Sequence, residues 1–204
     1  EAVIARPAAQ AHFLARAPVT AQHTPRAAGV FFGYDFHLSE AGPRLIEINT
    51  NAGGALLNAR LRAAHGLADA AVLDAAFLAM FREEWRCSRG DQPLACIAIV
   101  DEAPETQYLQ PEFVLFRALF EAAGIQALIA DPAEFVFERG ALFCRGQRVD
   151  LVYNRLTDFA LEEVGNTALR EAWLADAVVL TPHPHAHALY ADKRNLAALS
   201  DAAW

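Results

Sequence analysis

The segment Tyr34-Asp-Phe-His-Leu-Ser-Glu-Ala-Gly-Pro-Arg-Leu-Ile-Glu-Ile-Asn-Thr-Asn-Ala-Gly-Gly54 carries the clearest structural pattern in the chain. A strand-like run begins upstream at Gly29 and ends at Leu38, and a second run covers residues 44–49. The residues between them, Ser-Glu-Ala-Gly-Pro, are typical of a turn. Two such runs joined by a short turn predict a β-hairpin.

Oxygen-bearing side chains occupy matching places on both predicted strands. Asp35 lies on the first strand, and Glu47 and Asn49 are two residues apart on the second. Because strand side chains alternate between faces, Glu47 and Asn49 project from the same face. Mg²⁺ prefers oxygen donors of this kind and completes its coordination with water and nucleotide phosphates. A solvated polar face is the commoner meaning of this spacing alone, and His37 is left outside the ligand set because surface packing explains it.

The residues after the hairpin are rich in alanine and leucine. From Ala55 to Trp85 their periodicity predicts two helices with a break near Gly66. A linker is expected from Gly90 to Pro93. The first 26 residues show only broken helical periodicity and support no assignment.

Beyond residue 93 strands and helices alternate. The run Ala95–Val100 is fully apolar, as expected of a buried parallel strand. Such alternation predicts an α/β fold with a small doubly wound parallel sheet. The remaining predicted elements are a helix at Pro111–Ala123, a strand at Ile125–Ala130, a small hairpin around Gly140 and Gly146, a strand at Val149–Tyr153, a helix at about Thr167–Ala175, a strand at Ala177–Leu180 and a helix starting at His187.

Composition narrows the classes of partner. The 204 residues carry a formal net charge of -8, which disfavours a nucleic-acid groove or an anionic membrane surface and favours small molecules. The three cysteines lack C-x-x-C spacing, so neither a disulfide framework nor a zinc knuckle is indicated and a reducing cytoplasm is expected. No run of about 18 apolar residues occurs in the sequence. The oligomeric state stays open, a homodimer included.

The segment from Tyr34 to Gly53 closely resembles the last motif of ATP-grasp ligases such as the D-alanine:D-alanine ligases, in which a similar Asp-Phe strand leads to Glu-Ile-Asn-Thr-Asn-Pro-Gly. The resemblance implies that three residues bind catalytic Mg²⁺ and that others meet the substrate, where backbone N–H groups of the two glycines face an oxyanion. The implied metal ligands are Asp35, Glu47 and Asn49, and the implied substrate contacts are Asn51, Gly53 and Gly54. Ala52 replaces the usual proline, and Gly33 stands where relatives often place a phosphate-binding arginine.

The motif precedes the α/β region, whereas in ordinary ATP-grasp enzymes it ends the catalytic domain. This order resembles the circularly permuted ATP-grasp group that includes glutathionylspermidine synthetase. The resemblance implies part of the catalytic domain at 1–90, a Rossmann-like pre-ATP-grasp domain at 91–186 and the start of a returning nucleotide lobe at 187–204. Lys193 would then contact ATP, and the protein is expected to continue past Trp204. The 204 residues are accordingly expected to be an incomplete fragment of the ligase that binds ATP poorly.

The implied activity is an ATP- and Mg²⁺-dependent ligation. ATP phosphorylates a substrate carboxylate, and an amine or a thiol then displaces phosphate from the acyl phosphate. The alternative is a non-catalytic α/β module that binds a small molecule or peptide and keeps a vestigial metal motif. A dinucleotide-dependent dehydrogenase is disfavoured because strand 96–100 leads into Asp-Glu-Ala-Pro-Glu instead of a glycine-rich turn.

Arg155 and a group of histidines complete the candidates. Arg155 follows a predicted parallel strand, where α/β sheets place ligands, so it is a candidate for binding an anionic substrate; an ordinary ion pair with Asp158 is the alternative. The run Pro182-His-Pro-His-Ala-His187 has alternating imidazoles, but its two prolines favour a loop. No supporting cysteine or carboxylate spacing accompanies them, which disfavours a zinc site.

Overall fold

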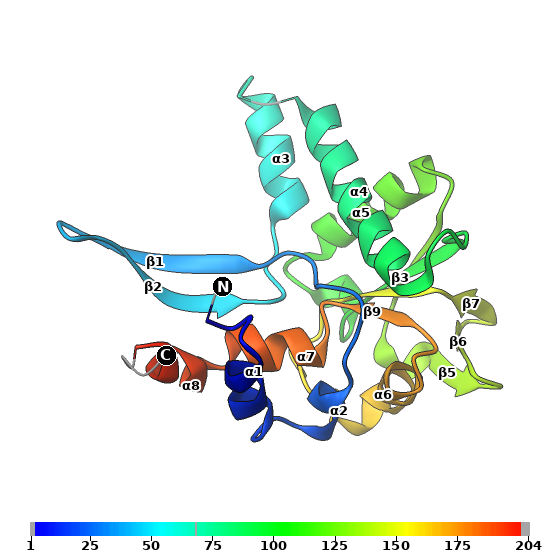
Figure 1. Ribbon diagram of the computed structural model, residues 1–204. Helices are drawn as coiled ribbons and strands as arrows, with labels where there is room; N and C mark the ends of the chain where they lie inside the picture. The colour runs from blue at the N-terminus through cyan, green and yellow to red at the C-terminus, as the bar shows by residue number, and fades with distance from the viewer. Residues whose placement is uncertain (1–2, 68, 201–204) are drawn as a thin grey trace.

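A four-stranded parallel sheet lies at the centre of the computed structural model, which describes residues 3–67 and 69–200. Residues 1–2, 68 and 201–204, which belong to the predicted segments 1–90 and 187–204, lie outside the described residues. The strand order β4-β3-β8-β9 confirms the predicted α/β class and parallel sheet (Figure 1). The strands are β3 (Cys96–Val100), β4 (Gln126–Ala130), β8 (Leu151–Asn154) and β9 (Val179–Thr181).

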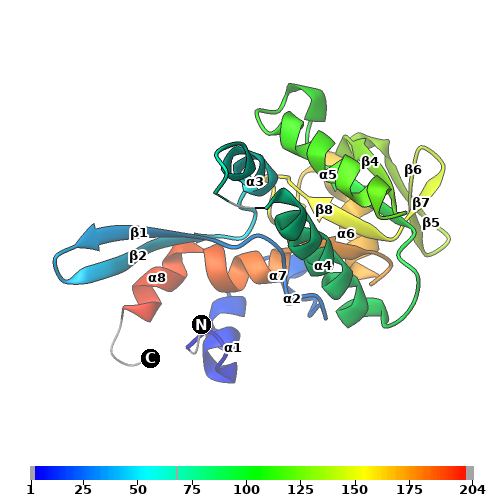
Figure 2. The same cartoon turned by 90° about the horizontal axis from the view of Figure 1, so that it is seen from above.

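Helices cover both faces of this sheet (Figure 2). Helices α4 (Ala70–Arg89) and α5 (Gln110–Ala122) pack on the face that receives Ile97 and Ile99. Helix α6 (Thr167–Leu174) packs on the opposite face, with Ala98 and Val100. Because alternate residues of β3 enter different cores, the whole strand is apolar.

Short elements join the main strands and helices. The strands β5 (Phe135–Glu138), β6 (Ala141–Cys144) and β7 (Gln147–Val149) form a small antiparallel sheet around the predicted turns at Gly140 and Gly146. Single 3₁₀ turns are η1 (Pro104–Thr106), η2 (Pro132–Glu134) and η3 (Val164–Asn166). The three cysteines all lie in the described part of the chain and are free thiols.

The buried carboxylate of Glu84 on α4 connects the hairpin region to the sheet. It accepts hydrogen bonds from the backbone N–H groups of Ala28 and Gly29 and from the hydroxyl of Thr181 on β9. Ala27 and Val30 are buried in the same core as α4 and the sheet. A domain boundary near Gly90 stays a prediction, but the segments on its two sides share this core.

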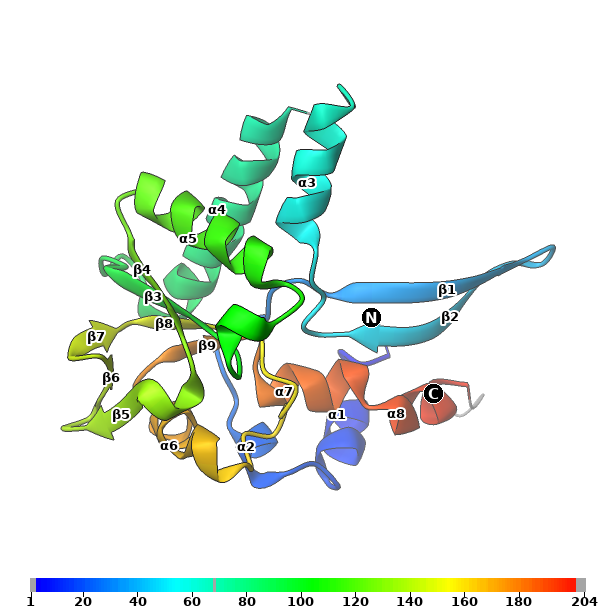
Figure 3. The same ribbon diagram turned by 180° about the vertical axis from the view of Figure 1, so that it is seen from behind.

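The predicted hairpin consists of β1 (Gly33–Ser39) and β2 (Gly42–Asn49), and it projects away from the sheet (Figure 1). Its first strand begins at Gly33 instead of Gly29, because the preceding residues pack into the core and bond to α4. The turn is also tighter than predicted, with Pro43 paired to Leu38 inside the strands. Helix α3 (Ala55–Ala64) follows and lies beside α4, as Figure 3 shows.

The N-terminal and C-terminal helices pack together under the hairpin. Helices α1 (Pro7–Leu14) and α2 (Val19–Gln22) come from the region without a prediction, and Phe13 of α1 packs with Leu189. The C-terminal elements are α7 (Pro184–Ala186), a π-helical turn η4 (His187–Ala191) and α8 (Lys193–Leu199). The helix expected from His187 is therefore divided at Asp192, whose side chain caps α8. Within the described part, no helix is long and apolar enough to cross a membrane.

Candidate functional site

The three predicted metal ligands lie together at the base of the hairpin. Asp35 and Glu47 are opposite each other in the antiparallel register, and Asn49 is two residues beyond Glu47. The Asn49 amide nitrogen lies 3.2 Å from Glu47 Oε1 and 3.5 Å from Asp35 Oδ2. Two carboxylates and one amide converge there, as the strand periodicity predicts.

Lys193 contributes a positive charge to this group. Its Nζ lies 2.8 Å from Glu47 Oε2, because α8 runs beneath β2 (Figures 1 and 2). The Lys193 ammonium, followed by the Asn49 amide, lowers the pKa of Glu47, and Glu47 in turn raises the pKa of Lys193. Two predicted site residues from distant parts of the sequence thus meet, while their roles stay predictions.

The donor set suits a hard cation. Carboxylate and amide oxygens are ligands that Mg²⁺ accepts, with water and phosphate oxygens filling its remaining positions. Asn49 turns its amide nitrogen towards the carboxylates, so a bound cation requires its Oδ1 there, which a half-turn of the amide provides. Across the described residues no group of three or more His, Cys, Asp or Glu side chains could hold a metal ion, and the hairpin cluster itself offers two carboxylates and an amide.

Arg155 lies under the loop that follows β2. The side chain is 6 % exposed, and its Nη1 donates to the backbone oxygens of Asn51, at 2.7 Å, and Ala52, at 3.2 Å. Its buried Nε has no hydrogen-bond partner in the described part of the chain. Arg155 and Asn51 are therefore in contact, but the Arg155 guanidinium binds backbone carbonyl groups of the chain itself.

Asp158, which was considered as an ion-pair partner of Arg155, forms hydrogen bonds with other residues. One Asp158 carboxylate oxygen accepts from the Glu163 backbone N–H at 2.8 Å and from the Asn166 amide at 2.7 Å. These bonds hold the loop after β8, and they help to lower the pKa of Asp158 against the opposing effect of burial. The ordinary ion pair considered for Arg155 is absent from the described residues.

The glycines of the motif face a carboxylate of the chain itself. Glu112 on α5 is 1 % exposed and accepts from the N–H groups of Gly54, at 2.7 Å, and Leu56, at 2.8 Å. This carboxylate lies at the N-terminus of α3, where negative charge is stabilised. A substrate oxyanion at Gly54 would have to replace it. A Cβ on Gly53 would lie 2.3 Å from Leu109 Cδ1 and 2.9 Å from Arg155 Nη2, so a larger residue requires the ends of these side chains to shift.

The two departures from the ATP-grasp pattern are neighbours in space. A Cβ built on Gly33 would lie 3.0 Å from the Cβ of Ala52 and 3.6 Å from that of Asn49. The space above Gly33 is therefore occupied by the loop that carries Ala52. An arginine at residue 33 would require this loop to shift, because contacts of 3.0 Å between such carbons are rare.

The three histidines of residues 182–187 have separate structural contacts. His183 lies 3.0 Å from Ala27 O through Nε2 and accepts from the Ala186 N–H through Nδ1; burial lowers its pKa to about 4. The Nδ1 of His185 lies 2.7 Å from Ala21 O. The expected loop is instead the short helix α7, which Pro184 begins in a position where its missing N–H costs nothing.

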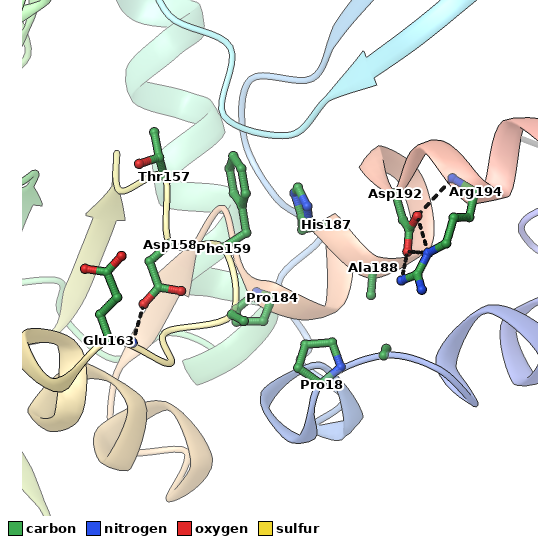
Figure 4. Close-up of a pocket in the computed structure, with 12 residues that line it drawn as sticks. Pro18, Thr157, Asp158, Phe159, Glu163, Pro184, His187, Ala188, Asp192 and Arg194 are labelled. Carbon is green, nitrogen blue, oxygen red and sulfur yellow. Dashed lines mark hydrogen bonds and ion pairs between the residues drawn. The ribbon is translucent and has the colours of Figure 1, made fainter.

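A cavity of about 460 Å³ opens beside these histidines (Figure 4). Its walls come from the loop after β8, the C-terminal helices and the connection between α1 and α2. In Figure 4 Phe159 and His187 face each other across its upper edge, with ring centroids 3.9 Å apart and planes at 8°. The lining residues are Ala17, Pro18, Thr157, Asp158, Phe159, Ala160, Glu163, Pro184, His187, Ala188, Asp192 and Arg194.

Sequence reasoning missed this cavity and the role of Glu112. The cavity walls are far apart in the sequence, and Glu112 carries no local signal beyond its place in the first turn of a helix. The sequence suggested His187 only as a possible metal ligand. Its place after two prolines gave no indication that its ring stacks on that of Phe159. In comparisons with known proteins, the chain matches no family model and no curated protein.

Proposed function

We propose that the chain provides the Mg²⁺-binding part of an ATP-grasp-type ligase that joins a carboxylate to an amine or a thiol. The observation that supports this most is the cross-strand pair Asp35 and Glu47, with Asn49 in contact with both. The resemblance of residues 34–53 to the ATP-grasp motif adds the identity of the nucleotide, ATP.

The candidate residues would have three different tasks. Asp35, Glu47 and Asn49 would hold magnesium, which when bound neutralises charge on the phosphates. Lys193, which is paired with Glu47, would exchange this carboxylate for a nucleotide phosphate. Arg155 holds the loop that follows β2 through hydrogen bonds to two backbone carbonyl groups of that loop.

The chemistry proceeds in two transfers. A carboxylate oxygen of the substrate attacks the γ-phosphorus of ATP, ADP leaves, and an acyl phosphate forms. The nitrogen or sulfur of the second substrate then attacks the carbonyl carbon, and inorganic phosphate departs with the electrons of the broken C–O bond. The protein contributes mainly positioning and fixed charge, as is usual in phosphoryl transfer.

Isothermal titration calorimetry of Mg²⁺ and Mg-ATP tests the proposal. We expect Mg²⁺ to bind the wild-type chain and this binding to be lost in Glu47→Ala. Glu40→Ala, which removes an exposed carboxylate from the hairpin turn, is the matched control and should bind as wild type does. Absence of both Mg²⁺ and Mg-ATP binding from the wild-type chain would contradict the ligase assignment.

The second candidate is a non-catalytic module that binds a small molecule or a peptide. The close approach of Gly33 to Ala52, where ligases often have a phosphate-binding arginine, favours it. The 460 Å³ cavity would then be the binding site. Binding of a small molecule by a chain that does not bind Mg-ATP would support this candidate over the ligase.

A further inference from the structure

The loop that joins the proposed metal ligand Asn49 to α3 is bound by a carboxylate from another helix. Glu112 on α5 is 1 % exposed, and its Oε2 and Oε1 accept from the N–H groups of Gly54, at 2.7 Å, and Leu56, at 2.8 Å. Gly54 directly precedes α3 and has no side chain that could cap this helix. Glu112 supplies the cap instead, because α5 lies next to α3 (Figures 2 and 3).

Arg155 binds the same loop with the opposite polarity. Its side chain is 6 % exposed, and its Nη1 donates to the backbone oxygens of Asn51 and Ala52. A Cβ built on Gly53 would lie 2.9 Å from Arg155 Nη2 and 3.7 Å from Glu112 Oε2. Gly53 therefore lies between the two charges. Arg155 binds carbonyl groups before it in the chain, and Glu112 binds N–H groups after it.

Burial makes these hydrogen bonds costly to break. A buried charge that loses its hydrogen-bond partners is strongly destabilising, because no water takes their place. Among the described residues neither Glu112 nor Arg155 forms an ion pair. Displacement of the loop would therefore remove backbone partners from two buried charges at once. The loop is held in one position from both sides.

The position of this loop is passed on to the neighbouring metal ligand. Only Thr50 separates Asn49 from Asn51, whose carbonyl oxygen Arg155 binds. Thr50 is 1 % exposed, and its hydroxyl oxygen lies 3.3 Å from the Nδ1 of His187. The chain that follows Asn49 is therefore fixed by buried contacts, whereas most of the hairpin before it is exposed.

We infer that Glu112 is a positioning residue of the hairpin metal site, because together with Arg155 it holds the loop that sets the position of Asn49. The inference rests on the proposed function, in which Asn49 is a metal ligand. It differs from one expectation that the ATP-grasp resemblance gives. The N–H groups of Gly54 and Leu56 serve the loop through Glu112, so a substrate oxyanion does not bind to them.

Chemical rescue tests the inference. Glu112→Ala removes the carboxylate and leaves space for acetate, and acetamide is the neutral probe of the same shape. In Glu112→Ala the Mg²⁺ affinity measured by calorimetry should fall about tenfold, as on loss of a residue that supports a metal ligand. The amide protons of Gly54 and Leu56 should also exchange faster with solvent. Acetate should restore both properties, and acetamide should restore neither.

Two further variants accompany the rescue. Glu112→Gln keeps the size of the side chain and one of its two oxygens, so it preserves the fold if Glu112→Ala does not. It should bind Mg²⁺ several times more weakly than wild type, with faster exchange at Gly54 or Leu56. Glu121→Ala removes an exposed carboxylate from the same helix and is the matched control, which should behave as wild type does.

Unchanged amide exchange in both Glu112 variants, or equal effects of acetate and acetamide, would overturn the inference. Faster exchange with unchanged Mg²⁺ affinity would also overturn it, because Glu112 would then have a structural role alone. Saturable shifts of the Gly54 and Leu56 signals by acetate in wild type would refute the exclusion of a substrate oxyanion. Absence of Mg²⁺ binding from wild type would instead remove the proposed function, and amide exchange and its rescue would still decide whether Glu112 holds the loop.

Discussion

The parallel sheet and the β1–β2 hairpin are built on opposite principles. Every residue of β3, from Cys96 to Val100, is 0 % exposed, whereas Leu38 and Ile46 of the hairpin are 78 % and 53 % exposed. Burial of both faces stabilises the sheet, whereas strand pairing and contacts at its base stabilise the hairpin. The residues that stabilise the fold and the residues of the proposed chemistry therefore lie in separate regions, so substitutions in the two regions should have separable effects.

The largest expected effect is a loss of stability in the sheet region. Phe116 is fully buried and packs against Phe81 and Tyr153, so Phe116→Ala should lower the unfolding free energy by about 4 kcal/mol. Phe36→Ala, on the hairpin at 51 % exposure, should cost no more than about 1 kcal/mol. Urea denaturation measures both. Similar losses of unfolding free energy at the two positions would show that the sheet and the hairpin contribute equally to stability.

The second prediction concerns pH and His183. Burial lowers its pKa to about 4 in the folded chain, so the unfolded chain, with a pKa near 6.5, binds the proton first. Stability should therefore fall as pH falls from about 6.5 towards 4, by up to about 3 kcal/mol. Denaturation of wild type and His183→Gln across this range measures the contribution.

The control for the pH prediction is His37→Gln, which removes an exposed histidine from the hairpin. An equal change of slope in both variants would show that the effect is not specific to His183. Asp101, whose pKa burial raises to about 6, contributes with the opposite sign, because its folded form binds the proton first. The difference between wild type and His183→Gln removes this contribution. An unchanged slope in His183→Gln would contradict the assignment.

The third prediction places Arg155 between the two regions. Arg155→Met leaves the carbonyl oxygens of Asn51 and Ala52 without their donor, so stability should fall by about 2 kcal/mol. The loop should also open, which weakens Mg²⁺ binding without abolishing folding. Arg155→Lys, which can keep one donor, should restore part of both properties. Full Mg²⁺ affinity in Arg155→Met would show that the loop does not depend on this residue.

The smallest effect on stability is expected at Lys193. Its pair with Glu47 is on the surface, so Lys193→Met should leave the midpoint of urea denaturation close to that of wild type. Mg²⁺ alone should bind a few times more tightly, since the competing ammonium is gone, whereas Mg-ATP should bind more weakly. Calorimetry measures both, and changes in the same direction would refute a role for Lys193 in binding phosphate.

Local patterns allowed the hairpin and the four parallel strands to be predicted. The run Ala95–Val100 is apolar throughout because both of its faces are buried, and this appears directly in the sequence. The predicted start of β1 was wrong, although residues 29–32 are strand-like in composition. Gly29 donates a hydrogen bond to Glu84, and the residues after it pack into the core. Helix α1 was missed because its packing partner, Leu189, lies at the other end of the chain.

The candidate site divides in the same way. The proximity of Asp35, Glu47 and Asn49 follows from strand periodicity and a hairpin, both of which are local. The contacts of Lys193 with Glu47 and of Glu112 with Gly54 depend on how distant segments pack, which periodicity does not encode. A resemblance to known ligases placed Lys193 near the nucleotide, but no signal indicated Glu112.

Paramagnetic NMR with Mn²⁺ in place of Mg²⁺ tests whether the hairpin holds a cation, because it reports on the hairpin and on the sheet in one experiment. Substoichiometric Mn²⁺ should broaden the amide signals of Asp35, Glu47 and Asn49 and leave those of Cys96–Val100 sharp. Glu47→Gln should abolish the broadening, and Glu40→Gln should keep it. Broadening that is uniform, centred elsewhere or unchanged in Glu47→Gln would contradict a cation site in the hairpin.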